Sequence, residues 1–123
     1  MATHVAYPRR LAAGICFSAM VVLAAQAAET RLDGAAIQAL LADHSFAGDD
    51  GGRHSEQIFQ AAGATYYSVE GAQSQGRWTV RGDRFCSQWP PSDGWSCYEV
   101  MVEGPSVIFV SASGKRYVTT KIN

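Results

Sequence analysis

Apolar residues recur with two different periods along this chain of 123 residues. In the segment LDGAAIQALLADH, Ile37, Leu40 and Leu41 follow the i, i+3, i+4 spacing that places side chains on one face of an α-helix. Asp33 stands just before this segment, where its carboxylate can accept hydrogen bonds from the first free backbone N–H groups. The pattern therefore predicts one short helix at about residues 34–42.

After the helix the period changes to two, and short segments are separated by turn residues. The expected strands are HSFAG, HSEQIFQA, TYYSVE, RWTVR, RFCSQW, SCYEVMV, SVIFVSA and KRYVTTKI. The expected breaks include DDGGR at 49–53, Gly63 and GAQSQG at 71–76. These connections are too short for crossover helices, so the strands pair antiparallel. The predicted fold class is mainly all-β: an antiparallel meander of about eight strands in a small barrel or sandwich, with one short N-terminal helix.

The strand SVIFVSA is apolar on both faces. Val107 and Phe109 lie on one face, and Ile108 and Val110 lie on the other. Two interpretations follow: a buried central hairpin, or an edge through which two copies associate.

The N-terminal segment has the pattern of a secretory signal peptide. Arg9 and Arg10 precede a nearly continuous apolar run, which ends at the small-x-small triplet Ala25-Gln26-Ala27. The run is shorter than the roughly 20 residues of a spanning helix. We expect residues 1–27 to be a leader cleaved after Ala27, with Ala28 as the alternative. The product is then a single domain at 28–123, periplasmic or secreted, with no stable membrane span.

The charge of the expected mature chain bears on its partners. Without the leader the chain keeps eight basic and eleven acidic residues, a net charge of −3. Nucleic-acid binding requires a clustered basic face, so nucleic acid is not an expected partner. The expected partner is a small ligand or an envelope protein.

Cys86 and Cys97 are predicted to form a disulfide across a hairpin. If they face each other, Phe85 falls opposite Tyr98, and Arg84 falls opposite Glu99. Both pairs are favourable across strands, and a shift by one residue would destroy both. In an exported protein the disulfide is also the chemically expected state.

A second register follows from the turn at Gly82-Asp83. Glycine can take the positive φ of a two-residue hairpin loop. Val80 then faces Phe85, and Trp78 faces Ser87.

Other cysteine chemistry and known catalytic motifs find little support. Cys86 and Cys97 do not form Cys-x-x-Cys, and too few histidines accompany them for a zinc site. The sequence has no G-x-S-x-G elbow, H-E-x-x-H motif, P-loop or dinucleotide fingerprint. We therefore expect no enzyme, no catalytic residues, no metal and no cofactor.

Asp49, Asp50 and His54 lie close together around two glycines. They could serve as an acid–base set or gather a cation. A solvated turn is the alternative, because Asp and Gly are common turn residues.

Three aromatic residues are candidate ligand or partner contacts. Trp89 continues the face of Phe85, at the core or at a barrel mouth, whereas Trp95 falls at the hairpin tip or on the opposite face. Tyr66 and Tyr67 point to opposite faces of one strand, and Tyr67 is the candidate contact. Exposed tryptophan can stack on a ligand, or can instead cover the end of the core.

Gly76-x-Trp78-x-Val80 resembles the G-x-W signature of lipocalin-like, calycin-type small barrels. In that family the tryptophan closes one end of the barrel, although lipocalins are longer and carry the motif elsewhere in the chain. The longer pattern G-x-W-x-V-x-G-D-x-x-C, with a second Cys one strand later, resembles small exported proteobacterial domains of unknown function. That resemblance implies the fold, export and a disulfide between Cys86 and Cys97, and implies no activity.

Three functions are consistent with these observations. The leading one is an exported, non-catalytic binding domain with a lipocalin-like barrel. The first alternative is an envelope protein-interaction or inhibitor module that uses exposed loops. The second is a small hydrolase built on His54 with Asp49 or Asp50.

Overall fold

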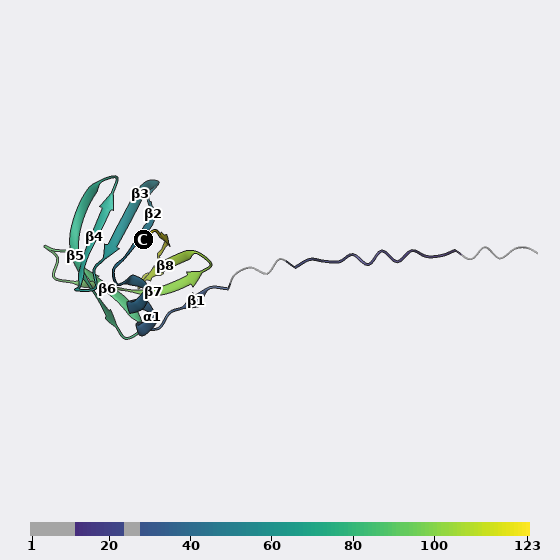
Figure 1. Ribbon diagram of the computed structural model, residues 1–123, viewed down its shortest axis with the longest axis horizontal. Coiled ribbons are helices and arrows are strands. Elements are labelled where there is room, and N and C mark those ends of the chain that lie inside the picture. The colour runs from purple at the N-terminus through teal and green to yellow at the C-terminus, as the bar shows by residue number, and fades with distance from the viewer. Residues whose placement is uncertain (1–11, 24–27) are drawn as a thin grey trace, which may run out of the picture.

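The computed structural model describes residues 12–23 and 28–123. Residues 12–23 are exposed and form neither helix nor strand (Figure 1). Arg9, Arg10 and the triplet Ala25-Gln26-Ala27, on which the leader prediction depends, lie outside the described residues. Among the described segments no helix is long and apolar enough to cross a membrane.

Residues 28–123 form one helix and a series of antiparallel strands. The elements are β1 (Thr30–Arg31), α1 (Gly34–Leu41), β2 (His44–Asp50), β3 (Arg53–Phe59), β4 (Ala64–Val69), β5 (Ala72–Arg81), β6 (Arg84–Gln88), β7 (Trp95–Glu103), β8 (Ser106–Ser111) and β9 (Arg116–Lys121). The predicted helix and the eight predicted strands are all present. The two-residue strand β1, which pairs with β7, has no counterpart in the prediction.

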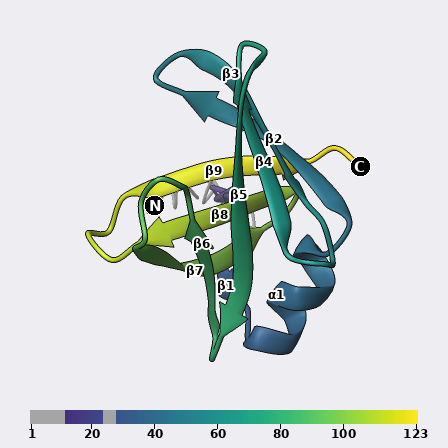
Figure 2. The same ribbon diagram turned by 90° about the vertical axis from the view of Figure 1, so that its left-hand side faces the viewer.

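Strands β2 to β9 close into an eight-stranded antiparallel barrel. Each strand pairs with its neighbour along the chain, and β2 pairs with β9 to join the two ends of the meander (Figure 2). The barrel, and not the sandwich, is therefore the correct alternative. Strand β8 pairs with both β7 and β9, so it is not a free edge available for self-association.

Helix α1 lies at one end of the barrel, and local contacts hold it there (Figure 2). The Asp33 carboxylate accepts a hydrogen bond from the Ala36 backbone N–H at 2.8 Å, as the capping prediction requires. The Gly34 N–H donates to the Asp83 carboxylate in the β5–β6 turn at 2.8 Å. A Cβ atom at Gly34 would lie 2.2 Å from the Gly82 carbonyl oxygen, so only glycine permits this close approach.

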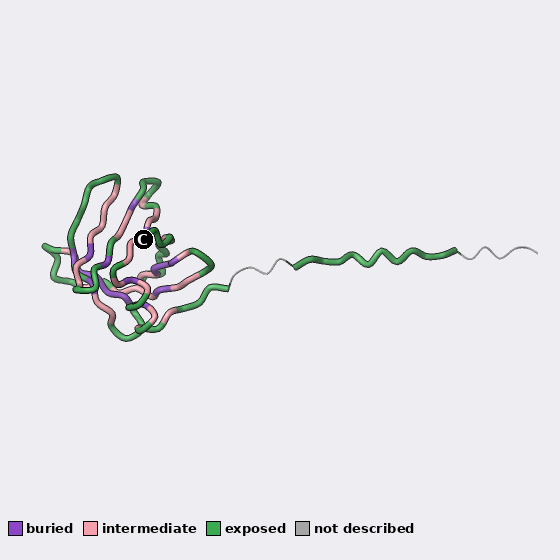
Figure 3. The backbone as a smooth tube through the Cα atoms, viewed as in Figure 1, coloured by how far each residue is buried: buried purple, intermediate pink, exposed green. Residues whose placement is uncertain are grey.

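The aromatic core fills the same end of the barrel as α1. Ile37 and Leu41 of the helix are fully buried against it. Phe59 is at its centre, with ring centroids 5.5 Å from Trp78 and 5.3 Å from Phe85. Such edge-to-face contacts add to the stability that burial provides. Buried residues concentrate toward the helix, and the hairpin tips at the other end are exposed (Figure 3).

Two predicted loops are wrong, because strand pairing extends through them. Residues 72–76 belong to β5 and pair with β4, so the turn consists of Glu70 and Gly71 alone, with φ of 47° and 86°. Asp49 and Asp50 likewise belong to β2, and the turn is formed by Gly51 and Gly52. A polar segment can therefore still form a strand when its side chains are exposed to water.

The predicted cysteine pairing is confirmed. Cys86 and Cys97 face each other across β6 and β7 in a disulfide, with Cα atoms 4.0 Å apart. Phe85 faces Tyr98 as predicted, and their rings stack at 5.6 Å. The registers Val80–Phe85 and Trp78–Ser87 are also confirmed.

The predicted Arg84–Glu99 pair is wrong. The β6–β7 ladder ends at Phe85 and Tyr98, one residue before this pair would form. Glu99 forms an ion pair with Arg31 of β1 at 3.5 Å instead. Beyond the end of the β6–β7 ladder, β7 pairs with β1.

Candidate functional site: the open mouth of the barrel

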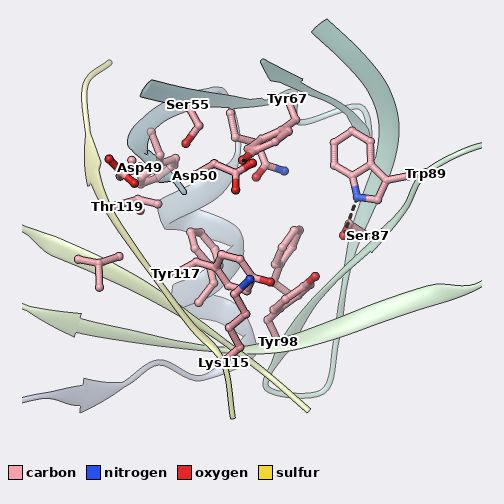
Figure 4. Close-up of a pocket in the computed structure, with 16 residues that line it drawn as sticks. Asp49, Asp50, Ser55, Tyr67, Ser87, Trp89, Tyr98, Lys115, Tyr117 and Thr119 are labelled. Carbon is pink, nitrogen blue, oxygen red and sulfur yellow. Dashed lines mark hydrogen bonds between the residues drawn. The ribbon is translucent and has the colours of Figure 1, made fainter. Parts of the chain in front are cut away.

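A cavity of about 320 Å³ occupies the end of the barrel opposite α1 (Figure 4). Its base is formed by phenylalanines of the core: Phe46, Phe85 and Phe109. Its walls are tyrosine, tryptophan and short polar side chains directed inward from the strands. The labelled wall and rim residues are Asp49, Asp50, Ser55, Tyr67, Ser87, Trp89, Tyr98, Lys115, Tyr117 and Thr119.

Alternation along the strands places these residues inside. In β4, Thr65 is buried under the cavity and Tyr67 lines it two residues further along. In β6, Phe85 belongs to the base and Ser87 to the wall. The inward face of each strand therefore passes from apolar near α1 to polar near the mouth.

Tyr67 and Asp50 form the best-defined polar contact of the mouth. The Tyr67 hydroxyl donates to the Asp50 carboxylate at 3.1 Å. Burial raises the pKa of Tyr67 above its usual value, the Ser55 hydroxyl lowers it, and Asp50 raises it again. The Tyr67 hydroxyl is thus held in its neutral form, in which it can donate a hydrogen bond to the Asp50 carboxylate.

Trp89 forms the part of the wall next to Tyr67, and its position depends on a glycine. A Cβ atom at Gly76 would lie 2.7 Å from the Trp89 ring, so the indole packs directly on the bare backbone of β5. The indole N–H donates to the Ser87 hydroxyl at 3.2 Å. The Trp89 and Tyr67 rings meet edge to face with centroids 6.2 Å apart.

Tyr98 and Tyr117 complete the aromatic wall. Their ring centroids lie 6.1 Å apart at an interplanar angle of 80°. Burial raises the pKa of Tyr98, and the neighbouring Tyr117 raises it further. The Lys115 ammonium lies 4.9 Å from the Tyr117 ring centroid, within the range of a cation–π contact.

Of the three predicted contact residues, Tyr67 and Trp89 line the cavity and Trp95 does not. Trp95 pairs with Gln88, one position out of phase with the inward-facing Ser87. Its ring therefore lies on the outer surface, where the guanidinium carbons of Arg81 and Arg77 lie 4.7 Å and 6.0 Å from its centroid.

The β2–β3 ladder places His54 directly opposite Asp49, but among the described residues no hydrogen bond or ion pair joins His54 to Asp49 or Asp50. His54 Nε2 lies 3.0 Å from the Glu56 carboxylate, and 64% of the side chain is exposed. Asp49 accepts a hydrogen bond from the Gly52 backbone N–H at 2.6 Å, and Asp50 accepts the one from Tyr67. The two aspartates lie at the rim of the cavity, whereas His54 is not among its lining residues.

The side chains at the mouth offer groups that can contact a small molecule. Across residues 12–23 and 28–123, no three His, Cys, Asp or Glu side chains gather as a metal site would require. Aromatic faces, one bonded carboxylate and a few hydroxyl and amide groups suit a small organic molecule with an apolar part and a polar or charged group.

Tyr98 and Tyr117 were not singled out as site residues from the sequence. Tyr98 was identified only through its pairing with Phe85, and this pairing does place it on the inward face. In β9, Tyr117 and Thr119 lie two residues apart and both line the cavity, but no pattern in the sequence marks their face of the strand as the inward one. Which inward residues meet at the mouth depends on how the strands are staggered around the barrel.

Comparisons of the chain with models of protein families, with curated proteins and with solved structures find no match. No enzyme-related relative or fold is thus found. The resemblance to small exported domains, and the likeness to lipocalins at Gly76 and Trp78, stay predictions. The disulfide-linked β-barrel with a cavity at its mouth is what the structure establishes for this chain.

Proposed function

We propose that this protein is an exported, non-catalytic barrel that binds a small ligand in its open mouth. The observation that carries the proposal is the cavity of about 320 Å³, closed below by phenylalanines and walled by four aromatic rings. Small-molecule sites are concave, mostly apolar and supplied with a few convergent polar groups, in volumes of roughly 300–1,000 Å³. The mouth has each of these properties.

Export is supported by the disulfide and by the N-terminal pattern. Disulfides persist in oxidising compartments such as the periplasm and the cell exterior. The bond between Cys86 and Cys97 fits that environment. Periplasmic or secreted placement, with a leader cleaved after Ala27, is part of the proposal.

The alternatives have less support from the site. An interaction or inhibitor module would use the protruding hairpin tips, and needs no cavity beneath them. A hydrolase would require His54 to face a carboxylate inside a concave site. His54 instead faces Glu56 at an exposed position.

The proposal is tested by screening a panel of neutral, anionic and cationic fragments by saturation-transfer NMR. The wild-type protein is compared with Trp89→Leu, which removes an indole from the mouth, and with Trp95→Leu, which removes one from the outer surface. We expect fragments to bind wild type and Trp95→Leu, and to lose most of their signal with Trp89→Leu. Native mass spectrometry of the exported protein would also detect a ligand carried from the cell.

An absence of any saturable fragment would contradict the proposal. Equal binding by all three proteins would place the ligand outside the mouth and contradict it as well. Circular dichroism of each variant checks that the comparison is made between folded proteins.

A further inference from the structure

The mouth presents four aromatic rings to one cavity. Tyr67 comes from β4, Trp89 follows β6, Tyr98 lies in β7 and Tyr117 in β9. They form two edge-to-face pairs, Tyr67 with Trp89 at 6.2 Å and Tyr98 with Tyr117 at 6.1 Å (Figure 4). We refer to these four residues as the aromatic box. An aromatic ring carries negative charge on its face, so a ring whose face borders the cavity attracts a cation.

The net charge of the residues that line the mouth is negative, as is the charge on the aromatic ring faces. Asp49 and Asp50 line the rim, and Lys115 is the one basic residue among the lining side chains. Asp50 already bonds Tyr67, which fixes a carboxylate beside the box. An anionic ligand would be repelled by these groups, whereas a positively charged ligand would be attracted to them.

Lys115 indicates that the box can hold a cation. Its ammonium lies 4.9 Å from the Tyr117 ring centroid, although the residue is on an exposed turn with solvent available to it. It marks one ring face as a position where positive charge is stabilised. A ligand cation would compete with it.

We propose that the mouth binds a small ligand through a quaternary or tertiary ammonium group, which the aromatic box and Asp50 recognise. This rests on the proposed function and adds the chemical class of the ligand. An alkylated ammonium is large, weakly hydrated and suited to aromatic walls. A metal ion would need a set of oxygen ligands, and no such group is present among the described residues.

The test compares choline with 3,3-dimethylbutan-1-ol, a neutral molecule of nearly the same shape. Both are titrated into the exported, ¹⁵N-labelled protein and followed by amide and indole chemical shifts. We expect choline to bind at least about tenfold more tightly than the neutral alcohol, with shifts centred on the indole of Trp89. The indole of Trp95, on the outer surface, serves as the internal control.

Four substitutions at three positions separate the charge from the shape of the mouth. Tyr117→Leu removes a ring face and is expected to weaken choline binding by about 2- to 30-fold, whereas Tyr117→Phe keeps the face and most of the affinity. Asp50→Asn removes the charge while its amide oxygen can still accept from Tyr67, and should weaken choline without affecting the alcohol. Lys115→Met removes the competing cation and should tighten choline binding by about threefold or more.

The failures of the two proposals are distinguishable. Equal affinity for choline and the alcohol overturns ammonium recognition and leaves a ligand-binding mouth. An absence of saturable shifts at millimolar choline also overturns it, and the fragment panel then decides separately on the proposed function. Choline shifts centred on Trp95 would overturn it too, because they would place the cation on the outer surface.

Discussion

The two ends of the barrel are built from the same strands and differ in what those strands direct inward. At the end covered by α1, Phe46 and Phe59 are 1% and 0% exposed. At the mouth, the inward residues are tyrosines with polar neighbours, and Tyr117 remains 40% exposed. One end stabilises the fold, and the other end leaves aromatic surface available to a ligand. Under the proposed function, stability and binding are thereby separated along a single axis.

The largest expected effect is a core truncation at the closed end. Phe59→Ala removes the central ring of the aromatic core and should lower the free energy of unfolding by about 3–5 kcal/mol, because it leaves a cavity that surrounding rings cannot fill. Tyr117→Ala at the mouth should cost about 1 kcal/mol or less, since water already reaches that site. Urea denaturation measures both. Equal losses would mean that the mouth is packed as tightly as the core.

The disulfide is the next largest contribution, and it acts between the two ends. Cys86 and Cys97 are 11 residues apart in sequence, so the bond closes a short loop. Replacing both with alanine should lower the free energy of unfolding by about 2–3 kcal/mol. An unchanged urea midpoint would contradict this, as would two free thiols in the mass of the exported protein.

A smaller change at Gly76 should affect the mouth more than the core. In Gly76→Ala the new Cβ atom meets the Gln88 carbonyl oxygen at 2.6 Å and the Trp89 ring at 2.7 Å, so both must move, and the expected loss of stability is about 1–3 kcal/mol. Fragment binding should fall with it, and the fluorescence of Trp89 should shift toward that of solvated indole. Gly94→Ala is the control, because its Cβ position lies in ordinary contact with the Ser92 hydroxyl at 3.7 Å, its φ is not in the left-handed region and it does not line the cavity. If the two variants bind fragments equally, Gly76 does not position Trp89.

The smallest expected effect is a dependence of stability on alkaline pH. The folded protein raises the pKa of Tyr67 and of Tyr98, in each case mainly through burial. The two neutral phenols contribute fully to the free energy of unfolding below pH 10.0, the ordinary pKa of tyrosine. This contribution is lost as the pH rises through the raised pKa values, because the tyrosines of the unfolded chain ionise first. Stability should therefore fall as the pH rises above about 10, the ordinary tyrosine pKa. The double variant Tyr67→Phe/Tyr98→Phe should show a shallower fall, and an equal slope would contradict burial of these phenols.

Short-range patterns predicted the local structure of the chain. Helical spacing and an acidic cap predicted α1, and it forms at Gly34–Leu41 with Asp33 as its cap. Alternation and turn chemistry predicted the two hairpin registers around Phe85, because a one-residue slip would send every side chain to the opposite face. The lengths of two polar loops were overestimated. Composition cannot distinguish a loop from a strand that extends beyond the barrel.

Closure of the barrel, and the site that closure creates, depended on contacts distant in sequence. Strand β2 pairs with β9 only in the folded chain, and this pairing brings Asp49, Asp50 and Tyr117 to one cavity. The sequence by itself determined which residues of a strand share a face, because alternation is a property of each strand alone. The tertiary structure alone decided which of them meet at the mouth, because the stagger of eight strands sets their heights along the barrel axis.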